Sequence, residues 1–171
     1  MSAMKKIRIE KVTLNIGAGK DQSRLEKGIV LLNAIASATP IKTVTKKRIQ
    51  EWGLRPGLPI GCKVTLRKEK AMKLLPRLLE AIDNKLLKRQ FDEMGNMAFG
   101  IKEYIEIPGV KYDPKIGIMG LEVCVTLERP GYRIKKRRLL ARKIGHHHQI
   151  TKQEAIEFIS KNFSTIISEE E

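Results

Sequence analysis

Apolar and polar residues alternate in two stretches of the chain, at residues 7–16 and 60–67. Successive side chains of a strand point to opposite faces of a sheet, so each stretch predicts a strand with one apolar and one polar face. In the first stretch the alternation changes phase at Glu10 and Lys11, which predicts a β-bulge. The polar positions are Lys11, Thr13 and Asn15 in the first strand and Lys63, Thr65 and Arg67 in the second.

Apolar residues have helical spacing in two further stretches, residues 23–36 and 69–88. Ser23 and Glu26 form a capping-box pattern at the start of the first helix. In the second, Pro76 is expected either to begin the main helix or to kink it. The expected buried stripes are Leu25, Ile29, Leu32 and Ile35 in the first helix and Met72, Leu75, Leu79, Ile82 and Leu86 in the second.

Three more strands complete the predicted sheet. Residues 41–47 form a strand that joins the strand at 60–67 through a basic connection rich in glycine and proline, which predicts a long-tipped hairpin. Two strands follow the second helix, at about residues 98–107 and 120–128. This order of elements favours an α+β fold over a doubly wound parallel sheet. We expect a two-layer sandwich, in which helices pack on one face of an antiparallel or mixed sheet.

The length of the chain suits one compact body with an appendage. Its 171 residues are 42% hydrophobic, which is enough for a core. We divide it into an α+β core at residues 1–128 and a basic extension at residues 129–171. Thr151 and Glu154 form a second capping-box pattern, which predicts a short helix in the extension. The acidic tail at residues 168–171 is expected to fray.

Charge narrows the class of function. The chain carries 34 Lys and Arg against 19 Asp and Glu, a formal net charge of +15, which is typical of a nucleic-acid binder. No apolar run approaches the ~20 residues of a membrane helix. The start, Met-Ser-Ala-Met-Lys-Lys, lacks the apolar stretch of a secretory signal. We therefore expect a cytosolic protein without membrane contact.

The polar sides of the two alternating strands carry the candidate RNA-binding residues. If the strands lie close in the sheet, their three cations stand beside Thr13, Asn15 and Thr65. Cations pair with phosphate, whereas hydroxyl and amide groups both donate and accept, so they can also meet base edges and ribose 2′-hydroxyls. The alternative is an ordinary solvated sheet face.

Trp52 is the only tryptophan and stands in the polar connection between Arg48 and Arg55. A tryptophan in a loop either tucks against its own domain or offers a platform on which an exposed base stacks. Both interpretations stay open on the sequence alone.

Residues 129–143 contain eight cations and no carboxylate. Such a block repels itself unless an anion lies nearby, so we interpret it as an arm that binds RNA phosphates rather than as a solvated linker. After Arg129, its cations are Arg133, Lys135, Lys136, Arg137, Arg138, Arg142 and Lys143.

Other motifs do not support catalysis, a cofactor or a metal. The Gly17–Lys20 turn has Gln22 in place of a third glycine, which favours a capped turn over a nucleotide-binding loop. Cys62 and Cys124 fall on opposite strand faces, so neither a disulfide nor a zinc site is expected. The residues His146–His148 are adjacent, and adjacent side chains rarely converge on one ion. No catalytic combination of side chains is recognisable, so we expect no enzyme.

Four segments together resemble the L5 family of large-subunit ribosomal proteins. They are Val12–Gly17, Arg55–Arg67, Phe99–Glu103 and Gly120–Val123. The resemblance spans roughly residues 6–128, and the basic extension is similar to that of the archaeal and eukaryotic branch rather than the bacterial one.

The resemblance implies a structural component of the large ribosomal subunit in the cytoplasm. Such a protein binds 5S ribosomal RNA, anchors it in the central protuberance, contacts P-site tRNA and helps to form an intersubunit bridge to the small-subunit head. The implied partners are 5S rRNA, large-subunit rRNA, P-site tRNA, a neighbouring 5S-associated ribosomal protein and a small-subunit head protein. The alternative is a free-standing RNA-binding regulatory protein.

The family's positions for 5S rRNA recognition correspond to Asn15, Thr65 and Trp52. The segment at residues 47–59 corresponds to its tRNA-facing loop. Two departures are visible: Ala38 stands where the family has a glutamine, and the N-terminal helix of bacterial members is absent. The residues implied to face tRNA are Lys47, Arg48, Arg55, Pro56 and Gly57.

Overall fold

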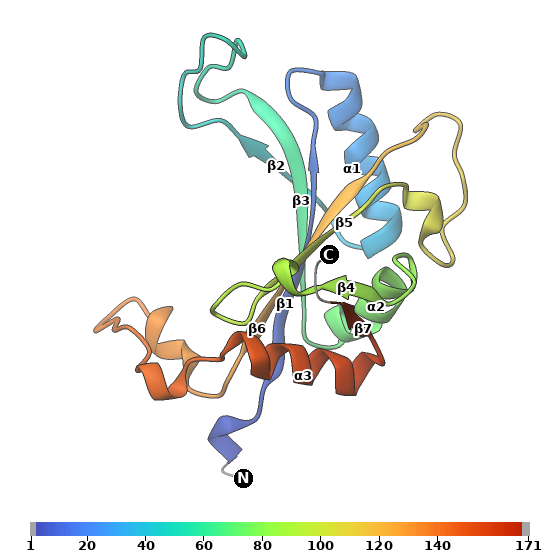
Figure 1. The fold of residues 1–171 in the computed structure, drawn as a ribbon. Helices are drawn as coiled ribbons and strands as arrows, with labels where there is room; N and C mark the ends of the chain where they lie inside the picture. Colours follow the sequence, from blue (N-terminus) through green and yellow to red (C-terminus); the bar gives the residue numbers. More distant parts are fainter. Residues whose placement is uncertain (1–2, 169–171) are drawn as a thin grey trace.

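A five-stranded antiparallel sheet forms the centre of the molecule (Figure 1). The computed structural model describes residues 3–168. The strands lie in the order β2-β3-β1-β6-β5, and each is antiparallel to its neighbours. The bounds are Arg8–Gly17 for β1, Ile41–Val44 for β2, Pro59–Arg67 for β3, Met97–Ile101 for β5 and Leu121–Glu128 for β6.

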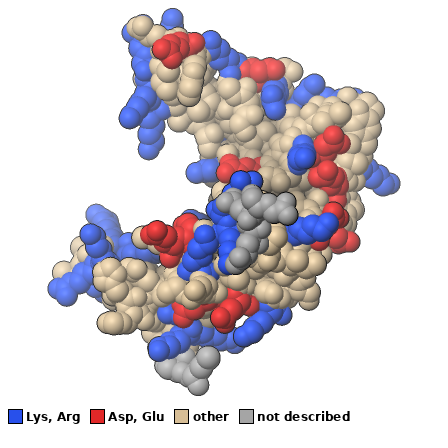
Figure 2. All heavy atoms as spheres, in the orientation of Figure 1, with Lys and Arg blue, Asp and Glu red and all other residues tan. Residues whose placement is uncertain are grey.

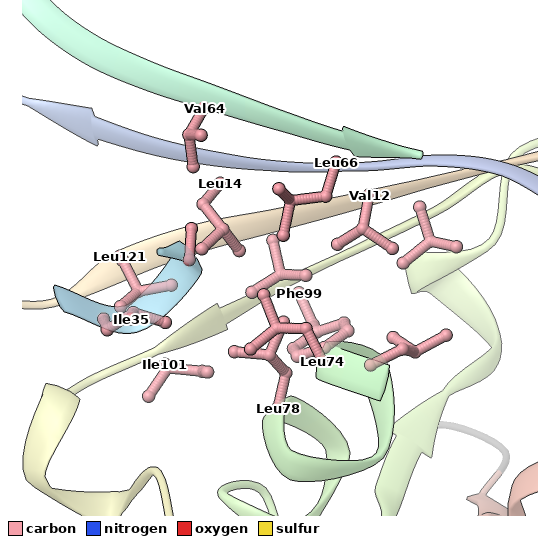
Figure 3. Close-up of a cluster of buried hydrophobic side chains, with 14 of the residues drawn as sticks. Val12, Leu14, Ile35, Val64, Leu66, Leu74, Leu78, Phe99, Ile101 and Leu121 are labelled. Atoms are coloured by element: carbon pink, nitrogen blue, oxygen red, sulfur yellow. The ribbon is translucent and has the colours of Figure 1, made fainter. Parts of the chain in front are cut away.

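Two helices, α1 (Gln22–Ala36) and α2 (Lys68–Glu80), cover one face of this sheet. The even-numbered residues of β3 and those of β1 from Val12 onward point toward them, and Val12 and Leu14 are fully buried. Figure 3 shows these side chains packed against Leu74 and Leu78 of α2. Burial of one such side chain contributes about 1.5–3 kcal/mol, so this layer holds the sheet and helices together. The predicted α+β two-layer fold is confirmed.

The first helix begins one residue earlier than the predicted range, and its cap is a different residue. Asp21 is its N-cap, and the Asp21 carboxylate accepts a hydrogen bond of 3.1 Å from the backbone N–H of Arg24. A carboxylate is a preferred N-cap because it satisfies a free N–H and suits the positive end of the helix dipole. The predicted capping box of Ser23 and Glu26 is therefore wrong. The helix ends at Ala36, as expected.

The second helix ends at Glu80, well before the predicted end at residue 88. Asp83 and Asn84 both have φ of +55°, a left-handed conformation that stops a helix and that these residue types tolerate. Leu86 is buried, but in strand β4 (Lys85–Leu87), and Met72 is 49% exposed. Pro76 lies inside α2 rather than at its start. Leu75 and Leu79 of the predicted stripe are buried, and the helix also buries Ala71, Leu74 and Leu78.

The strand predicted at residues 98–107 is shorter than expected. It ends at Ile101, and a 3-10 helix, η3 (Tyr104–Glu106), follows. The strand predicted at residues 41–47 also ends early, at Val44. The other 3-10 helices of the described chain are η1 (Ala3–Lys5), η2 (Lys88–Gln90), η4 (Tyr132–Lys135) and η5 (His146–His148).

The C-terminal region packs against the body. Helix α3 (Lys152–Phe163) opens with the predicted capping box, in which Thr151 and Glu154 bond reciprocally. Strand β7 (Ile166–Ser168) pairs in parallel with β4 as a second, two-stranded sheet, so Ser168 is ordered by pairing rather than frayed. The rest of the acidic tail, residues 169–171, lies outside the described residues. Tyr132, Ile150, Ala155 and Ile159 join the main core.

None of the helices described between residues 3 and 168 has both the length and the apolar character needed to cross a membrane. The division of the chain at residue 128 stays a prediction.

Candidate nucleic-acid interface

The register of β1 and β3 brings the six predicted polar residues together. Lys11 lies opposite Arg67, Thr13 opposite Thr65, and Asn15 opposite Lys63. Side chains of directly opposed residues share one face of a sheet, and this is the face away from α1 and α2. We call these six residues the polar face. Their expected proximity is confirmed, whereas their binding of RNA stays a prediction.

The predicted bulge places an unexpected carboxylate at one end of the polar face. The register of β1 against β6 shifts between Ile9 and Lys11, which leaves Glu10 as the extra residue. The Glu10 side chain is 5% exposed, and its Oε1 lies 3.0 Å from Arg67 Nη1 and 2.6 Å from Lys136 Nζ. A cation of the sheet and a cation of the arm therefore share one carboxylate.

The charge state of Glu10 follows from this contact. Burial by itself would raise its pKa, but hydrogen bonds from Lys136 and Arg67 outweigh burial and hold the pKa below its ordinary value of 4.5. Glu10 is thus ionised at neutral pH. Glu128 extends the cluster, because its carboxylate lies 2.8 Å from Arg8 Nη2 and 3.3 Å from Lys136 Nζ.

Strand β6 adds further groups beside the polar face. Glu122 lies opposite Asn15, and the Asn15 amide donates a hydrogen bond of 3.3 Å to the Glu122 carboxylate. An RNA acceptor must compete with Glu122 for that N–H. Cys124 lies opposite Thr13, whereas Cys62 is buried in the core, so the prediction that the two thiols face opposite sides is confirmed.

The long tip of the β2–β3 hairpin is held by its own hydrogen bonds. Thr45 Oγ1 donates to Leu58 O over 3.2 Å, and the backbone N–H of Gly57 donates to Thr45 O over 2.9 Å. Gly57 has φ of +86°, which explains a glycine there. The candidate cations of the tip are exposed; they are Lys47, Arg48 and Arg55, next to exposed Pro56.

Trp52 is 62% exposed at this tip. The interpretation that it tucks against its own domain is therefore wrong, and the stacking platform stays a prediction. Lys20 was missed in the sequence. Its ammonium lies so close to Gly53 that a Cβ at Gly53 would come within 2.6 Å of it, so Lys20 adds a cation to the tip.

The basic arm, which we define as residues 129–148, is anchored at both ends. Arg129 is 4% exposed, and its guanidinium donates to His148 O, to Gln149 O over 3.1 Å and to Glu154 over 2.6 Å. The Tyr132 hydroxyl donates to His148 O and accepts from the Ile150 N–H. Arg129 therefore fixes the structure and does not reach phosphate, contrary to its place in the predicted RNA-binding block.

The other cations of the arm are exposed, and some of them have partners within the chain. Lys136 is occupied by Glu10 and Glu128, as described above. Lys135 lies over the Tyr132 ring, with its Nζ 5.1 Å from the ring centroid. Arg137 is exposed and its Nε donates to Leu140 O. The remaining predicted cations of the arm are also exposed; they are Arg133, Arg138, Arg142 and Lys143.

The hairpin tip and the basic arm flank a hollow. In Figure 1 both project to the same side, away from α1 and α2, and Figure 2 shows a concave outline between them with Lys and Arg side chains on both lips. A polyanion that entered this hollow would meet cations of the tip and of the arm at once.

The alternative motifs have structural explanations. The N–H groups of Ala18 and Gly19 both donate to Ile60 O, at 2.9 and 3.0 Å, so two donors of the Gly17–Lys20 turn are in use within the chain, as in a capped turn. The His148 ring bonds Pro130 O over 2.8 Å. Within residues 3–168, no group of three or more His, Cys, Asp or Glu side chains is placed to hold a metal ion.

Sequence comparisons add an independent observation. Residues 2–55 match the family described as ribosomal protein L5, and residues 59–158 match the model of the C-terminus of the same ribosomal family. A large ribosomal subunit protein uL5 from Nanoarchaeum equitans is 50% identical over 165 residues, which cover 96% of this chain and 97% of the relative. The protein of that name from Sulfurisphaera tokodaii is 45% identical over an alignment of 173 residues including gaps. The alignment covers 99% of this chain and 96% of the relative. The chain belongs to the ribosomal protein L5 family.

Proposed function

We propose that this chain, a structural and non-enzymatic component of the large ribosomal subunit, binds 5S rRNA and anchors it in the central protuberance of cytoplasmic ribosomes. The observation that carries the proposal is the register of β1 and β3, which sets Thr13 against Thr65 and Asn15 against Lys63 on the face away from α1 and α2. Family membership supports the ribosome as the setting rather than a free-standing regulatory function.

The polar face has the chemistry that RNA requires. Residues on one face of a strand repeat every ~6.7 Å, and neighbouring strands lie ~4.8 Å apart, so the six side chains form a small grid. Lys63 and the neighbouring cations supply charge for phosphates. Thr13 and Thr65 supply hydroxyls that donate and accept, as recognition of a ribose 2′-hydroxyl requires.

The hairpin tip is the part that we propose to meet P-site tRNA. Its exposed cations Arg48 and Arg55 are suited to phosphate, and its internal hydrogen bonds limit the conformational freedom lost on contact. Trp52 adds an exposed aromatic surface for a base of the 5S rRNA. By resemblance to the family we also propose contacts with large-subunit rRNA, with a neighbouring 5S-associated protein and with a protein of the small-subunit head.

Single substitutions on the polar face test 5S rRNA binding. We expect Thr65→Val and Asn15→Ala each to weaken binding about fivefold, because each loses a hydrogen bond worth roughly 1 kcal/mol while the apolar face is untouched. Affinity is measured by filter binding with purified 5S rRNA, and circular dichroism checks the fold. The matched controls, Ser23→Ala and Asn33→Ala, change exposed residues of α1, the helix that covers the opposite face of the sheet, and should bind as the wild type does. Unchanged affinity in both test variants would contradict the proposed surface.

Cosedimentation distinguishes a ribosomal component from a free-standing RNA-binding regulator. A ribosomal component should sediment with large subunits at moderate salt, whereas a free-standing regulator should bind RNA but stay in the supernatant. Recovery of the purified chain only in the supernatant would contradict the ribosomal assignment.

A further inference from the structure

The tip of the basic arm presents two leucines to solvent. Leu139 and Leu140 are 77% and 78% exposed, the highest values among the exposed large hydrophobic residues of the described chain. The two leucines are adjacent in sequence, so they form one small apolar patch at the tip of the arm. Removal of exposed apolar groups from water by a partner is favourable and lowers the free energy.

The backbone of the same turn is strained. Leu140 has φ of +52°, a left-handed conformation that is unfavourable for a bulky residue. The conformation is held by hydrogen bonds from Arg137 Nε to Leu140 O, at 2.9 Å, and from the Arg142 N–H to Ile134 O, at 3.3 Å. Strained backbone that is fixed by its surroundings is typical of functional sites. An asparagine or glycine would suit this turn better, so the leucine has a cost for the free protein.

The charges around the turn indicate the kind of partner. No carboxylate occurs from Arg129 to Gln153 in the sequence. Arg138, Arg142 and Lys143 are exposed close to the two leucines along the chain. A partner that covers this tip must therefore offer negative charge around an apolar patch. RNA with an unstacked base has this combination, because the face of the base is apolar and its flanking phosphates are anionic.

We propose that the Leu139–Leu140 turn is an apolar wedge that packs against an unstacked base of ribosomal RNA while the flanking arginines bind the adjacent phosphates. Apolar side chains can contact exposed base faces, and the phosphate contacts orient them. This inference rests on the proposed RNA-binding function and adds a second contact, separate from the polar face.

Removal of the apolar surface without a change in charge tests the wedge. The double variant Leu139→Ser, Leu140→Asn keeps every cation, and Asn tolerates the left-handed conformation. Binding of the full chain is measured at several salt concentrations with purified 5S rRNA and, separately, with protein-free large-subunit rRNA. For one of the two RNAs we expect affinity to fall about tenfold with no change in the slope of log K against log salt.

Two further variants serve as controls. Arg138→Gln with Arg142→Gln should reduce the salt slope by about 0.7–0.9 for each phosphate contact that is lost. Ile118→Ser removes another exposed apolar residue, 72% exposed and outside the arm, and should leave affinity unchanged. Thermal unfolding should show no loss of stability in the wedge variant, because neither leucine is buried.

The outcomes are distinct. Unchanged affinity of the wedge variant for both RNAs, with normal binding by the wild type, would overturn the wedge and leave the proposed function intact. Unchanged RNA affinity together with weaker cosedimentation with large subunits would identify a protein partner and overturn the RNA contact. A wild-type chain that binds neither RNA would overturn the proposed function and the wedge with it.

Discussion

Glu10 joins the sheet to the basic arm. It is an anion in a chain of net charge +15, and its carboxylate contacts Arg67 of β3 and Lys136 of the arm. Two cations that the sequence assigns to RNA are thereby held in place before RNA is present. The contact also reduces the charge that these two side chains offer to phosphate, so the other cations of the polar face carry more of the attraction.

Glu10→Gln should lower the free energy of unfolding by about 1–2 kcal/mol near pH 7. Loss of a buried ionic partner is destabilising, but Arg67 and Lys136 are half-exposed, so water compensates part of the loss. The pKa of Glu10 is lower in the folded than in the unfolded protein, so its contribution is present above pH 4.5 and is lost as the pH falls through the folded pKa. The difference from wild type should therefore shrink in acid.

Urea unfolding of the wild type and Glu10→Gln at several pH values measures this difference. Glu26→Gln, which changes an exposed residue of α1, is the control and should have little effect at any pH. A difference for Glu10→Gln that stays constant down to about pH 3 would contradict the electrostatic explanation.

The sequence predicts the facing of some residues but not the contacts of others. The facing of Thr13 and Thr65 follows from strand alternation, because that pattern is local. The change of phase at Glu10 predicts the bulge but cannot name Lys136 as a partner, which lies far along the chain. Arg129 is indistinguishable in sequence from its basic neighbours. Only folding brings it beside two carbonyl groups and Glu154.

At the scale of elements, periodicity predicts the main sheet and its two covering helices but misplaces the end of α2. Leu86 continues the helical stripe in phase, yet Asp83 and Asn84 turn the chain and place Leu86 in β4. The partner of β4 is β7, at Ile166–Ser168. The two strands lie far apart in the sequence, so no local pattern predicts that they pair. Long-range parallel pairing of two three-residue strands lies beyond what periodicity can show.

The packing of α1 on the sheet gives a second prediction. A Cβ at Gly28 would lie 3.1 Å from Cys62 Sγ and 3.4 Å from Ile16 Cγ2, so the helix approaches the strands closely here. Gly28→Val should lower the free energy of unfolding by about 1–3 kcal/mol through overpacking. Urea unfolding measures the loss, and Ala34→Val on the exposed side of α1 is the control. Valine is a better helix former than glycine, so helix propensity alone would leave Gly28→Val neutral or slightly more stable, and no loss of stability in this variant would contradict the close packing.

At the scale of the whole molecule, the basic extension and the α+β body share one core. Truncation after Glu128 should lower the midpoint of thermal unfolding by several degrees, because it removes Tyr132, Ile150 and Ile159 from the core and leaves β4 without β7. A full-length variant with Arg133→Gln and Arg138→Gln removes arm charge only and should unfold at the wild-type midpoint. An unchanged midpoint for the truncated chain would contradict the shared core.

Net charge and composition predict the class of partner, but not the hollow between the hairpin tip and the arm (Figure 2). The sequence contains both basic segments, and their common direction depends on where β3 and β6 carry them in the sheet. The local patterns of the hairpin tip and of the arm do not show how the two are oriented. Their relative orientation follows only from the pairing of the strands between them.

The double anchoring of the arm, by Glu10 through Lys136 and by Arg129 through His148 and Gln149, affects the thermodynamics of association. A chain that must fold on its ligand loses conformational entropy at the moment of encounter. Here that loss has already occurred during folding of the free protein, so more of the gross contact energy remains as affinity. Complex formation should then proceed without a slow ordering step and with a small change in heat capacity.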